Sequence, residues 1–223
     1  MNKENNMTVP PKVRLFRLTH IDNLDTLLRR EALHAPLHTP HDGLPYRTIH
    51  DASIQEKRYQ RSIPCGPSGV IHDYLPFYLG PLSPMLYKLG KGGVEGYDEG
   101  EEPLIYLIAR AEEVASRNMG FVFSDGHGIA AFTQWFDTLD SLGKLDWPVI
   151  LGRVWADTTE DNDRKRRKQA EFLIHKSLPW DMIQGIAVLN EIMADKVKAI
   201  LAQFPDLHHP PVHPVPQWYY QGG

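Results

Sequence analysis

Leu104-Ile105-Tyr106-Leu107-Ile108-Ala109 is an unbroken apolar stretch near the middle of the chain. A continuous apolar run of this length predicts a strand that is buried on both faces. Further apolar stretches on its C-terminal side predict four more strands, at 121–123, 149–155, 171–174 and 183–188. These strands do not alternate with helical segments in regular strand–helix–strand units. The sequence therefore predicts an α+β fold.

Apolar residues at helical spacing mark the helices that we expect around these strands. The segments are 21–28, 54–59, 132–139 and 193–204. Asn190 is the expected N-cap of the last helix, because an asparagine side chain accepts a hydrogen bond from a first-turn N–H. The tail at 205–216 is rich in proline and histidine, so we expect it to be irregular. Trp218, Tyr219 and Tyr220 are expected to dock back on the domain.

The length of 223 residues is enough to bury the core of one domain. We place this domain at 13–223, behind a flexible leader at 1–12. The leader has no apolar core and is not a secretory signal. The chain contains no apolar run of the roughly 18 residues that a membrane span needs, and its single cysteine, Cys65, excludes an internal disulfide. These features favour a cytoplasmic protein with no membrane partner.

The common nucleotide and metal signatures are absent from the sequence. No G-x-G-x-x-G follows a predicted strand, and no H-E-x-x-H is present. His208, His209 and His213 lie among prolines, where the four well-placed ligands of a structural zinc site are not expected. We therefore expect no metal, and any nucleotide chemistry must use another kind of site.

Five short segments, taken together, carry a family resemblance. They are Arg17-Leu18-Thr19-His20-Ile21-Asp22-Asn23-Leu24, Ile54-Gln55-Glu56-Lys57-Arg58, His72-Asp73-Tyr74-Leu75-Pro76-Phe77-Tyr78, Pro81-Leu82-Ser83-Pro84-Met85-Leu86-Tyr87 and Lys168-Gln169-Ala170-Glu171-Phe172-Leu173. In this order they resemble the DarT family of bacterial toxins. The resemblance extends from about residue 13 to Tyr220.

The resemblance implies the ADP-ribosyltransferase fold, a split and strongly bent β-core with flanking helices that holds NAD in a cleft. It implies a toxin that transfers ADP-ribose from NAD to a base of single-stranded DNA and releases nicotinamide. Thymine is the expected base, and NAD is a substrate. Members of the family are paired with a macrodomain antitoxin of the DarG type, which removes the modification. Such an antitoxin is therefore the expected partner.

The resemblance also assigns the residues of the NAD site. The catalytic glutamate of the family corresponds to Glu171, and its key arginine corresponds to Arg58, a catalytic and NAD-binding residue. The other expected NAD contacts are Arg17, Leu18, Thr19, Thr26 and His34.

The chemistry of the reaction agrees with these assignments. Cleavage of the nicotinamide–ribose bond gives the ribose oxocarbenium character, as in glycoside cleavage. A fixed carboxylate such as Glu171 stabilises that charge. A guanidinium such as Arg58 matches a diphosphate and positions charge, but it is a poor general base because its pKa lies above about 12.

The basic run at 164–168 is the expected DNA contact of a chain whose net charge is −4. Such a run, taken alone, is most often a solvated face. Its place just before Glu171 favours phosphate binding, which is sensitive to salt and independent of sequence. Arg153 and Trp155 are expected to pair or stack with flipped-out bases. The complete set of expected DNA contacts is Ser83, Met85, Arg153, Trp155, Lys165, Arg166, Arg167 and Lys168.

Three alternative functions remain open from the residues. The first is an ADP-ribosyltransferase that acts on guanine or on RNA, and the second is an NAD glycohydrolase that passes ADP-ribose to water. The third is a non-catalytic module that binds single-stranded nucleic acid. The presence of both Arg58 and Glu171 favours an active enzyme over this module.

Overall fold

The apolar stretch at 104–109 is a central strand of the fold. In the computed structural model, which describes residues 9–222, it forms β4 (Leu104–Arg110) between β1 (Arg14–His20) and β9 (Gly185–Val188). Successive side chains of a strand point to opposite faces of the sheet. Alternate residues of β4 therefore enter two different hydrophobic clusters, with Ile105 and Leu107 in one and Leu104 and Tyr106 in the other. Both faces of β4 are covered, which explains why the stretch is apolar throughout.

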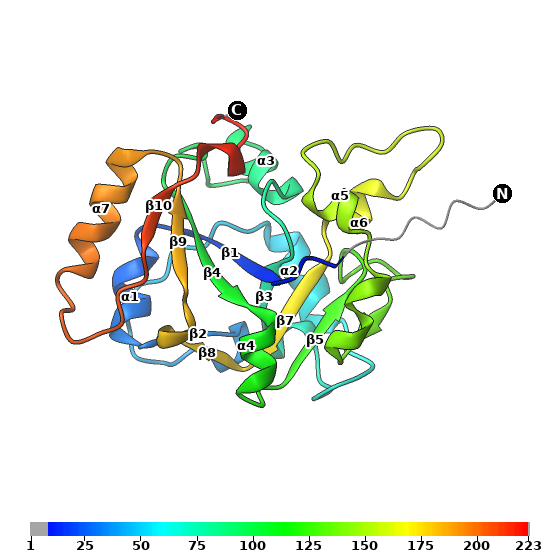
Figure 1. The fold of residues 1–223 in the computed structure, drawn as a ribbon, viewed down its shortest axis with the longest axis horizontal. Helices are drawn as coiled ribbons and strands as arrows, with labels where there is room; N and C mark the ends of the chain where they lie inside the picture. The colour runs from blue at the N-terminus through cyan, green and yellow to red at the C-terminus, as the bar shows by residue number, and fades with distance from the viewer. Residues whose placement is uncertain (1–8, 223) are drawn as a thin grey trace.

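Within residues 9–222, eight strands form one sheet in the order β10-β9-β4-β1-β3-β7-β5-β6 (Figure 1). Neighbouring strands are antiparallel except β9 and β10. The strands not yet given are β3 (Tyr74–Tyr78), β5 (Phe121–Ser124), β6 (Trp135–Phe136), β7 (Glu171–His175) and β10 (Val212–Pro214). A separate two-stranded sheet pairs β2 (Ala32–His34) with β8 (Ser177–Pro179).

The helices surround this sheet. Figure 1 shows α1 (Asn23–Arg29) and α7 (Glu191–Leu201) together at the β10 end of the sheet, and their residues are in contact. The other α-helices are α2 (Ala52–Gln60), α3 (Pro84–Gly90), α4 (Ala111–Ser116), α5 (Trp147–Leu151) and α6 (Arg164–Lys168). The mixture of a largely antiparallel sheet with flanking helices confirms the α+β prediction. Among residues 9–222, no helix has the length and hydrophobicity of a transmembrane segment.

The sequence pattern of α7 is borne out in detail. Met193, Val197 and Leu201 recur every four residues, and all three are buried against the core. The Asn190 side chain accepts a hydrogen bond of 2.9 Å from the Met193 N–H, as expected for the N-cap. Local signals and packing agree in this helix. The helix predicted at 193–204 is confirmed, except that it ends at Leu201.

The helix predicted at 132–139 is wrong. Trp135 and Phe136 form the short strand β6, which pairs with β5, and a 3₁₀ helix follows at Leu139–Lys144. Phe136 lies opposite Phe123, with 5.3 Å between the ring centroids. This cross-strand packing outweighs the helical spacing of the apolar residues, because strand preference depends on the neighbours that a sheet provides.

The strand predicted at 149–155 is also wrong, because its first half is the helix α5. The Asp146 carboxylate caps this helix by accepting a hydrogen bond from the Val149 N–H, and Pro148 lies in the first turn. Trp147 and Ile150 are buried, and the chain beyond Leu151 is a loop. A short apolar run does not distinguish a strand from a buried helix by its periodicity.

The two ends of the chain differ from their sequence predictions in part. Residues 1–8 of the predicted leader lie outside the described residues, but Val9 packs against the main core. The predicted irregular tail contains β10, which pairs in parallel with β9. The predicted docking of the C-terminal aromatic residues is confirmed at Tyr219, whose buried hydroxyl shares its one hydrogen between the Leu104 and Ala187 carbonyl oxygens, at 2.9 and 3.1 Å.

Candidate active site

The C-terminal end of β3 lies beside the N-terminal end of its neighbouring strand β7. The two strands are antiparallel, and their register pairs Tyr78 with Glu171. The turn after β3 leads into α3, and α6 leads into β7, so both helices lie near this pair. The strand register thus places the predicted catalytic glutamate on a rigid part of the core rather than on a loop.

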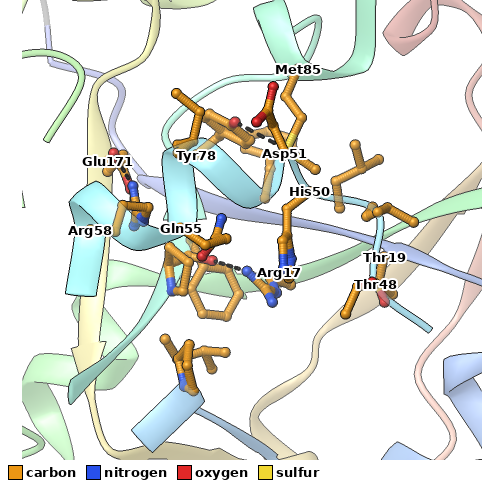
Figure 2. Close-up of a pocket in the computed structure, with 18 of the residues that line it drawn as sticks. Arg17, Thr19, Thr48, His50, Asp51, Gln55, Arg58, Tyr78, Met85 and Glu171 are labelled. Carbon is orange, nitrogen blue, oxygen red and sulfur yellow. Dashed lines mark hydrogen bonds and ion pairs between the residues drawn. The ribbon is translucent and has the colours of Figure 1, made fainter. Parts of the chain in front are cut away.

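Glu171 forms a buried, two-pronged ion pair with Arg58 of α2. Arg58 Nη1 lies 2.9 Å from Glu171 Oε1, and Nη2 lies 2.7 Å from Oε2. The exposed fraction of Glu171 is 5%, and that of Arg58 is 7%. The Gly128 N–H donates a further hydrogen bond of 3.1 Å to Oε1. Figure 2 shows the pair at the left of the view, with Arg17 and His50 near its middle.

The two charges of this pair hold each other in the ionised state. Burial raises the pKa of the Glu171 carboxyl, but the charge and hydrogen bonds of Arg58 outweigh burial, so this pKa lies below its ordinary value. Burial lowers the pKa of the Arg58 guanidinium, but Glu171 outweighs that effect and raises it. Arg58 therefore remains protonated, and Glu171 remains a carboxylate at neutral pH.

The turn at 124–128 supports the carboxylate from the side of β5. The Glu171 N–H donates to Ser124 Oγ at 3.3 Å, and Ser124 Oγ donates to the Gly126 carbonyl oxygen at 2.7 Å. His127 Nδ1 lies 3.9 Å from Glu171 Oε1. Burial is the largest effect on the pKa of His127 and lowers it, so the imidazole is neutral at neutral pH. His127 belongs to the turn that orients Glu171.

A cavity of about 780 Å³ opens in front of the ion pair. This volume lies within the range of small-molecule and cofactor sites. Residues that were assigned to NAD from the sequence line it together with the ion pair, and they are Arg17, Leu18, Thr19, His34, Arg58 and Glu171. The cavity therefore gathers residues from β1, β2, α2 and β7 into one place.

The residues of β1 are held in the cavity wall by neighbouring backbone. Arg17 Nη1 donates a hydrogen bond of 3.1 Å to the Pro76 carbonyl oxygen of β3. Thr19 Oγ1 accepts a hydrogen bond of 3.0 Å from the Asn23 side-chain amide, and Asn23 also binds the backbone of Arg47. These contacts tie β1 to the loop at 45–48, which forms another part of the wall. Cation, hydroxyl and apolar groups therefore face the same space.

Comparison with known proteins identifies the family of the chain. A model of the DarT family, described as ssDNA thymidine ADP-ribosyltransferase, matches residues 16–220. The chain belongs to the DarT family. The DNA ADP-ribosyl transferase of Thermus sp. strain 2.9 is 40% identical over 213 residues, which cover 96% of this chain and 99% of the relative.

Two solved structures of Thermus sp. 2.9 DarT have the same fold. The complex with ADP-ribosylated ssDNA gives a TM-score of 0.89 at 40% identity, and the match covers 96% of this chain and 99% of the other. The complex with NAD+ gives a TM-score of 0.86 at 38% identity, and the match covers 96% and 100%. Family membership confirms the predicted ADP-ribosyltransferase fold and the predicted class of enzyme, an NAD-dependent DNA ADP-ribosyltransferase.

Of two residues that the resemblance assigned to the NAD site, His34 lines the cavity and Thr26 does not. His34 lines the cavity, and burial, followed by the charge of Arg30, lowers its pKa. Thr26 is only 1% exposed, and its hydroxyl donates a hydrogen bond of 2.7 Å to the Pro45 carbonyl oxygen. The structure therefore corrects the predicted contact of Thr26 with NAD. Its side chain holds the loop at 45–48 instead of lining the cavity.

Two DNA contacts were predicted in the segment at 81–87, Ser83 and Met85, and only one of these residues lines the cavity. Met85 of α3 lines the cavity. Ser83 is buried, and its Oγ accepts a hydrogen bond of 3.2 Å from the Leu86 N–H as the N-cap of α3. The predicted DNA contact of the Ser83 side chain is therefore corrected to a role in helix capping.

The basic run does not act as one surface. Lys165 is exposed and lines the cavity, as a DNA contact requires. The guanidinium of Arg166 is bound by Asp125 and Asp163, and that of Arg167 is bound by Asp146 and Asp161.

Lys168 is only 3% exposed, and its ammonium donates to backbone carbonyl oxygens. The predicted phosphate contact of Lys168 is therefore corrected, because its ammonium group is buried and fully bonded inside the protein. Arg166 and Arg167 are partly exposed beside their carboxylate partners, and their phosphate contacts stay predictions.

The two residues predicted to contact flipped-out bases are separated by the structure. Trp155 lines the cavity, its indole N–H donates to the Tyr220 hydroxyl, and its ring meets that of Tyr87 edge to face at 5.9 Å. Arg153 donates to the Tyr220 carbonyl oxygen at 3.2 Å and stacks on the Tyr220 ring. Arg153 is not among the residues that line the cavity. Trp155 is thus in place for a base, whereas Arg153 secures the C-terminal segment.

Several cavity residues were not assigned from the sequence. They come from the end of the long loop at 38–51 and from α2, and they are Thr48, His50, Asp51 and Gln55. Burial is the largest effect on the pKa of His50 and lowers it, followed by the charges of Arg17 and Arg58. The length of the loop and its richness in histidine and proline are the sequence signals that point to this region.

Proposed function

We propose that this protein transfers ADP-ribose from NAD+ to thymine in single-stranded DNA, with Glu171 and Arg58 as the catalytic pair. The observation that carries the proposal is the buried ion pair at the wall of a cavity that also gathers Arg17, Leu18 and Thr19. Family membership supports the reaction, and the geometry of the pair supports the roles of its two members.

The reaction exchanges one glycosidic bond for another. The bond between the nicotinamide nitrogen and ribose C1 breaks, and its electron pair leaves with nicotinamide, which becomes neutral. A new bond forms between C1 and a nitrogen of the base, which loses its proton to solvent or to a basic group. In thymidine N1 carries the deoxyribose, so N3 is the ring nitrogen that remains. Atoms and charge balance with nicotinamide and one proton as the co-products.

Glu171 supplies negative charge where the ribose becomes positive. A carboxylate in a dry site stabilises oxocarbenium character more strongly than one in water. Glu171 is suited to this role because burial excludes water and Arg58 keeps the group ionised. The strand β7 and the Gly128 N–H fix its direction before the substrate binds. Such preorganisation lowers the barrier because no reorientation is needed in the transition state.

Arg58 acts by position and charge and not as a general base. Its pKa is raised, so Arg58 stays charged and does not offer a neutral guanidine to accept a proton from thymine. Both prongs of the guanidinium bind Glu171. Arg58 therefore orients the catalytic carboxylate, and its remaining contact area is available to substrate in the cavity.

The biological setting follows from the family. We propose that the protein is a toxin that acts in the cytoplasm, where NAD+ and DNA are found together. Its proposed partner is a macrodomain antitoxin of the DarG type, which removes ADP-ribose from DNA.

One experiment tests the reaction against its alternatives. The protein is incubated with NAD+ labelled in the adenylate phosphate and with oligonucleotides that differ only in content of thymine, guanine or ribose. We expect label on thymine-containing DNA and none on RNA or on DNA without thymine. Label on guanine-only DNA or on RNA would contradict the proposed target. Free labelled ADP-ribose with no labelled oligonucleotide would favour the glycohydrolase alternative.

A further inference from the structure

Lys168 has an unusual environment for a residue of a basic run. Its side chain is buried, and its Nζ atom donates hydrogen bonds to three backbone carbonyl oxygens: Pro81 at 3.0 Å, Ile150 at 2.7 Å and Gly152 at 2.7 Å. An ammonium group has three N–H donors. Each donor of Lys168 therefore has one acceptor, and the group is fully used inside the protein.

The three acceptors belong to two separate segments of the chain. Pro81 lies in the turn between β3 and α3, whereas Ile150 and Gly152 lie at the end of α5 and in the loop that follows. These segments approach each other closely at Gly80, where an added Cβ atom would lie 2.4 Å from the Ile150 carbonyl oxygen. Only glycine permits this approach. The carbonyl oxygens that meet there need a donor, and Lys168 provides it.

The turn before α3 has a conformation that needs such support. Leu82 has a φ of 58°, in the left-handed region that is unfavourable for a residue with a side chain. Its carbonyl oxygen accepts a hydrogen bond from the Tyr220 hydroxyl, and the preceding carbonyl is the one bound by Lys168. Two hydrogen bonds from distant parts of the chain therefore hold the turn at Leu82.

Both tethered segments lead directly to the wall of the cavity. The turn at 80–83 leads into α3, from which Met85 and Tyr87 line the cavity. The loop after α5 carries Trp155, which meets Tyr87 edge to face. Lys168 itself lies three residues before Glu171 in the chain. A single ammonium group thus connects the end of α6, which leads into the catalytic strand, to two parts of the wall.

We propose that Lys168 is a positioning residue whose ammonium group ties the turn before α3 and the end of α5 to the end of α6, three residues before Glu171. The tether holds Tyr87 and Trp155 in the edge-to-face contact that forms part of the cavity wall, where the DNA strand binds. This inference rests on the proposed function, since it takes DNA to pass Tyr87 and Trp155. Lys168 does not touch the reacting atoms and acts through the two segments that it binds.

Protonation of Lys168 is coupled to this tether. Burial lowers the pKa of Lys168 to about 8. The charged or titratable groups on the surrounding elements are Tyr78 of β3, Tyr87 and Lys88 of α3, Asp146 before α5, Arg153 after it, Glu171 and His175 of β7, Tyr220, and residues 164–167 of α6. Asp146 is bound by Arg167 and Glu171 by Arg58, so neither carboxylate pairs with Lys168. A neutral amine has two N–H donors, so deprotonation leaves one of the three carbonyl oxygens without its partner.

The test compares Lys168→Met and Lys168→Arg with the wild-type protein by the KM values for a thymine-containing oligonucleotide and for NAD+. We expect Lys168→Met to raise the KM for DNA about tenfold or more, because small misplacements of a binding wall are costly. The KM for NAD+ should stay within about twofold. Lys196→Gln on α7, an exposed lysine outside the cavity, is the control and should change neither value.

The pH profile provides a readout that a merely structural role would not move. Between about pH 7.5 and 9 the KM of the wild-type protein for DNA should rise, as Lys168 loses its proton. Lys168→Arg, which stays protonated, should show no such rise. A wild-type profile that is flat over this range overturns the proposal, even if Lys168→Met fails to fold.

Failure of the tether is distinguishable from failure of the proposed function. A wild-type protein that labels no DNA contradicts the function, and amide exchange at 80–90 and 150–156 then tests the tether alone. Exchange should be faster in Lys168→Met than in the wild-type protein. Labelling of DNA with an unchanged KM in a folded Lys168→Met variant overturns the positioning role, as do unchanged exchange rates.

Discussion

Arg58 and Glu171 are 113 positions apart in the sequence, yet each prong of the guanidinium meets one carboxylate oxygen, at 2.9 and 2.7 Å. Both side chains are nearly excluded from solvent. Removal of one partner from such a pair leaves the other as an uncompensated buried charge. The stability of the fold and the chemistry of the site therefore depend on the same two residues, and mutagenesis must separate these contributions.

Glu171→Ala is expected to abolish transfer by orders of magnitude and also to destabilise the protein. The cost in the free energy of unfolding should be about 3–5 kcal/mol, because Arg58 loses its only buried counter-ion partner among the described residues. The double variant Arg58→Met with Glu171→Leu should regain most of that stability and remain inactive. Urea unfolding and labelled-NAD+ transfer measure the two effects. Transfer by the stable double variant would remove the pair from the catalytic role.

Arg58→Lys is expected to lower turnover much more than it weakens NAD+ binding. A lysine keeps the positive charge but loses the fork that fixes both oxygens of Glu171. Misorientation of a catalytic group by about 1 Å costs on the order of a hundredfold in rate. Steady-state kinetics with NAD+ varied should show this fall in kcat and a KM within about threefold. A raised KM with unchanged kcat would show that Arg58 mainly binds the diphosphate.

Lys165→Gln is expected to weaken binding of single-stranded DNA and to reduce its dependence on salt. Lys165 is the member of the basic run that is exposed and lines the cavity. Loss of one phosphate contact lowers the slope of log K against log salt by roughly 0.7 for single strands. Fluorescence anisotropy at several salt concentrations measures this slope, and Lys196→Gln again provides the matched control. Equal slopes in the two variants would show that the DNA backbone does not pass Lys165.

The ion pair should also give the stability a defined dependence on acid pH. The pKa of Glu171 is lowered in the folded protein, so its contribution is complete above the unfolded value of about 4.5. The contribution is lost as the pH falls through the lower folded pKa. Between pH 6 and pH 3 the melting temperature of the wild-type protein should therefore fall more steeply than that of the Arg58→Met, Glu171→Leu variant. Thermal unfolding measures both. Parallel pH profiles would contradict this expectation.

Much of the fold could be predicted from local sequence patterns. The apolar stretch at 104–109 predicted a strand covered on both faces, and the spacing of Met193, Val197 and Leu201 predicted one face of a helix. The five segments that resemble the DarT family, taken together, predicted the family and the enzyme class. The errors at 132–139 and 149–155 occurred where a short apolar run suits either a helix or a strand. In the first segment, pairing with β5 made β6 a strand. In the second, the Asp146 cap favoured the helix α5.

Only the tertiary structure determined which cations of the basic run are exposed and which are buried or paired. Lys165 and Lys168 are identical in type and three positions apart, yet one faces solvent and the other is buried. In the helix α6 successive side chains point in different directions, and the partners that each meets come from remote segments, such as Asp125 for Arg166 and Pro81 for Lys168. The sequence determined how many cations precede Glu171. Folding determined which of them remains available to DNA, because a buried charge must find its partners among groups that only the fold brings near.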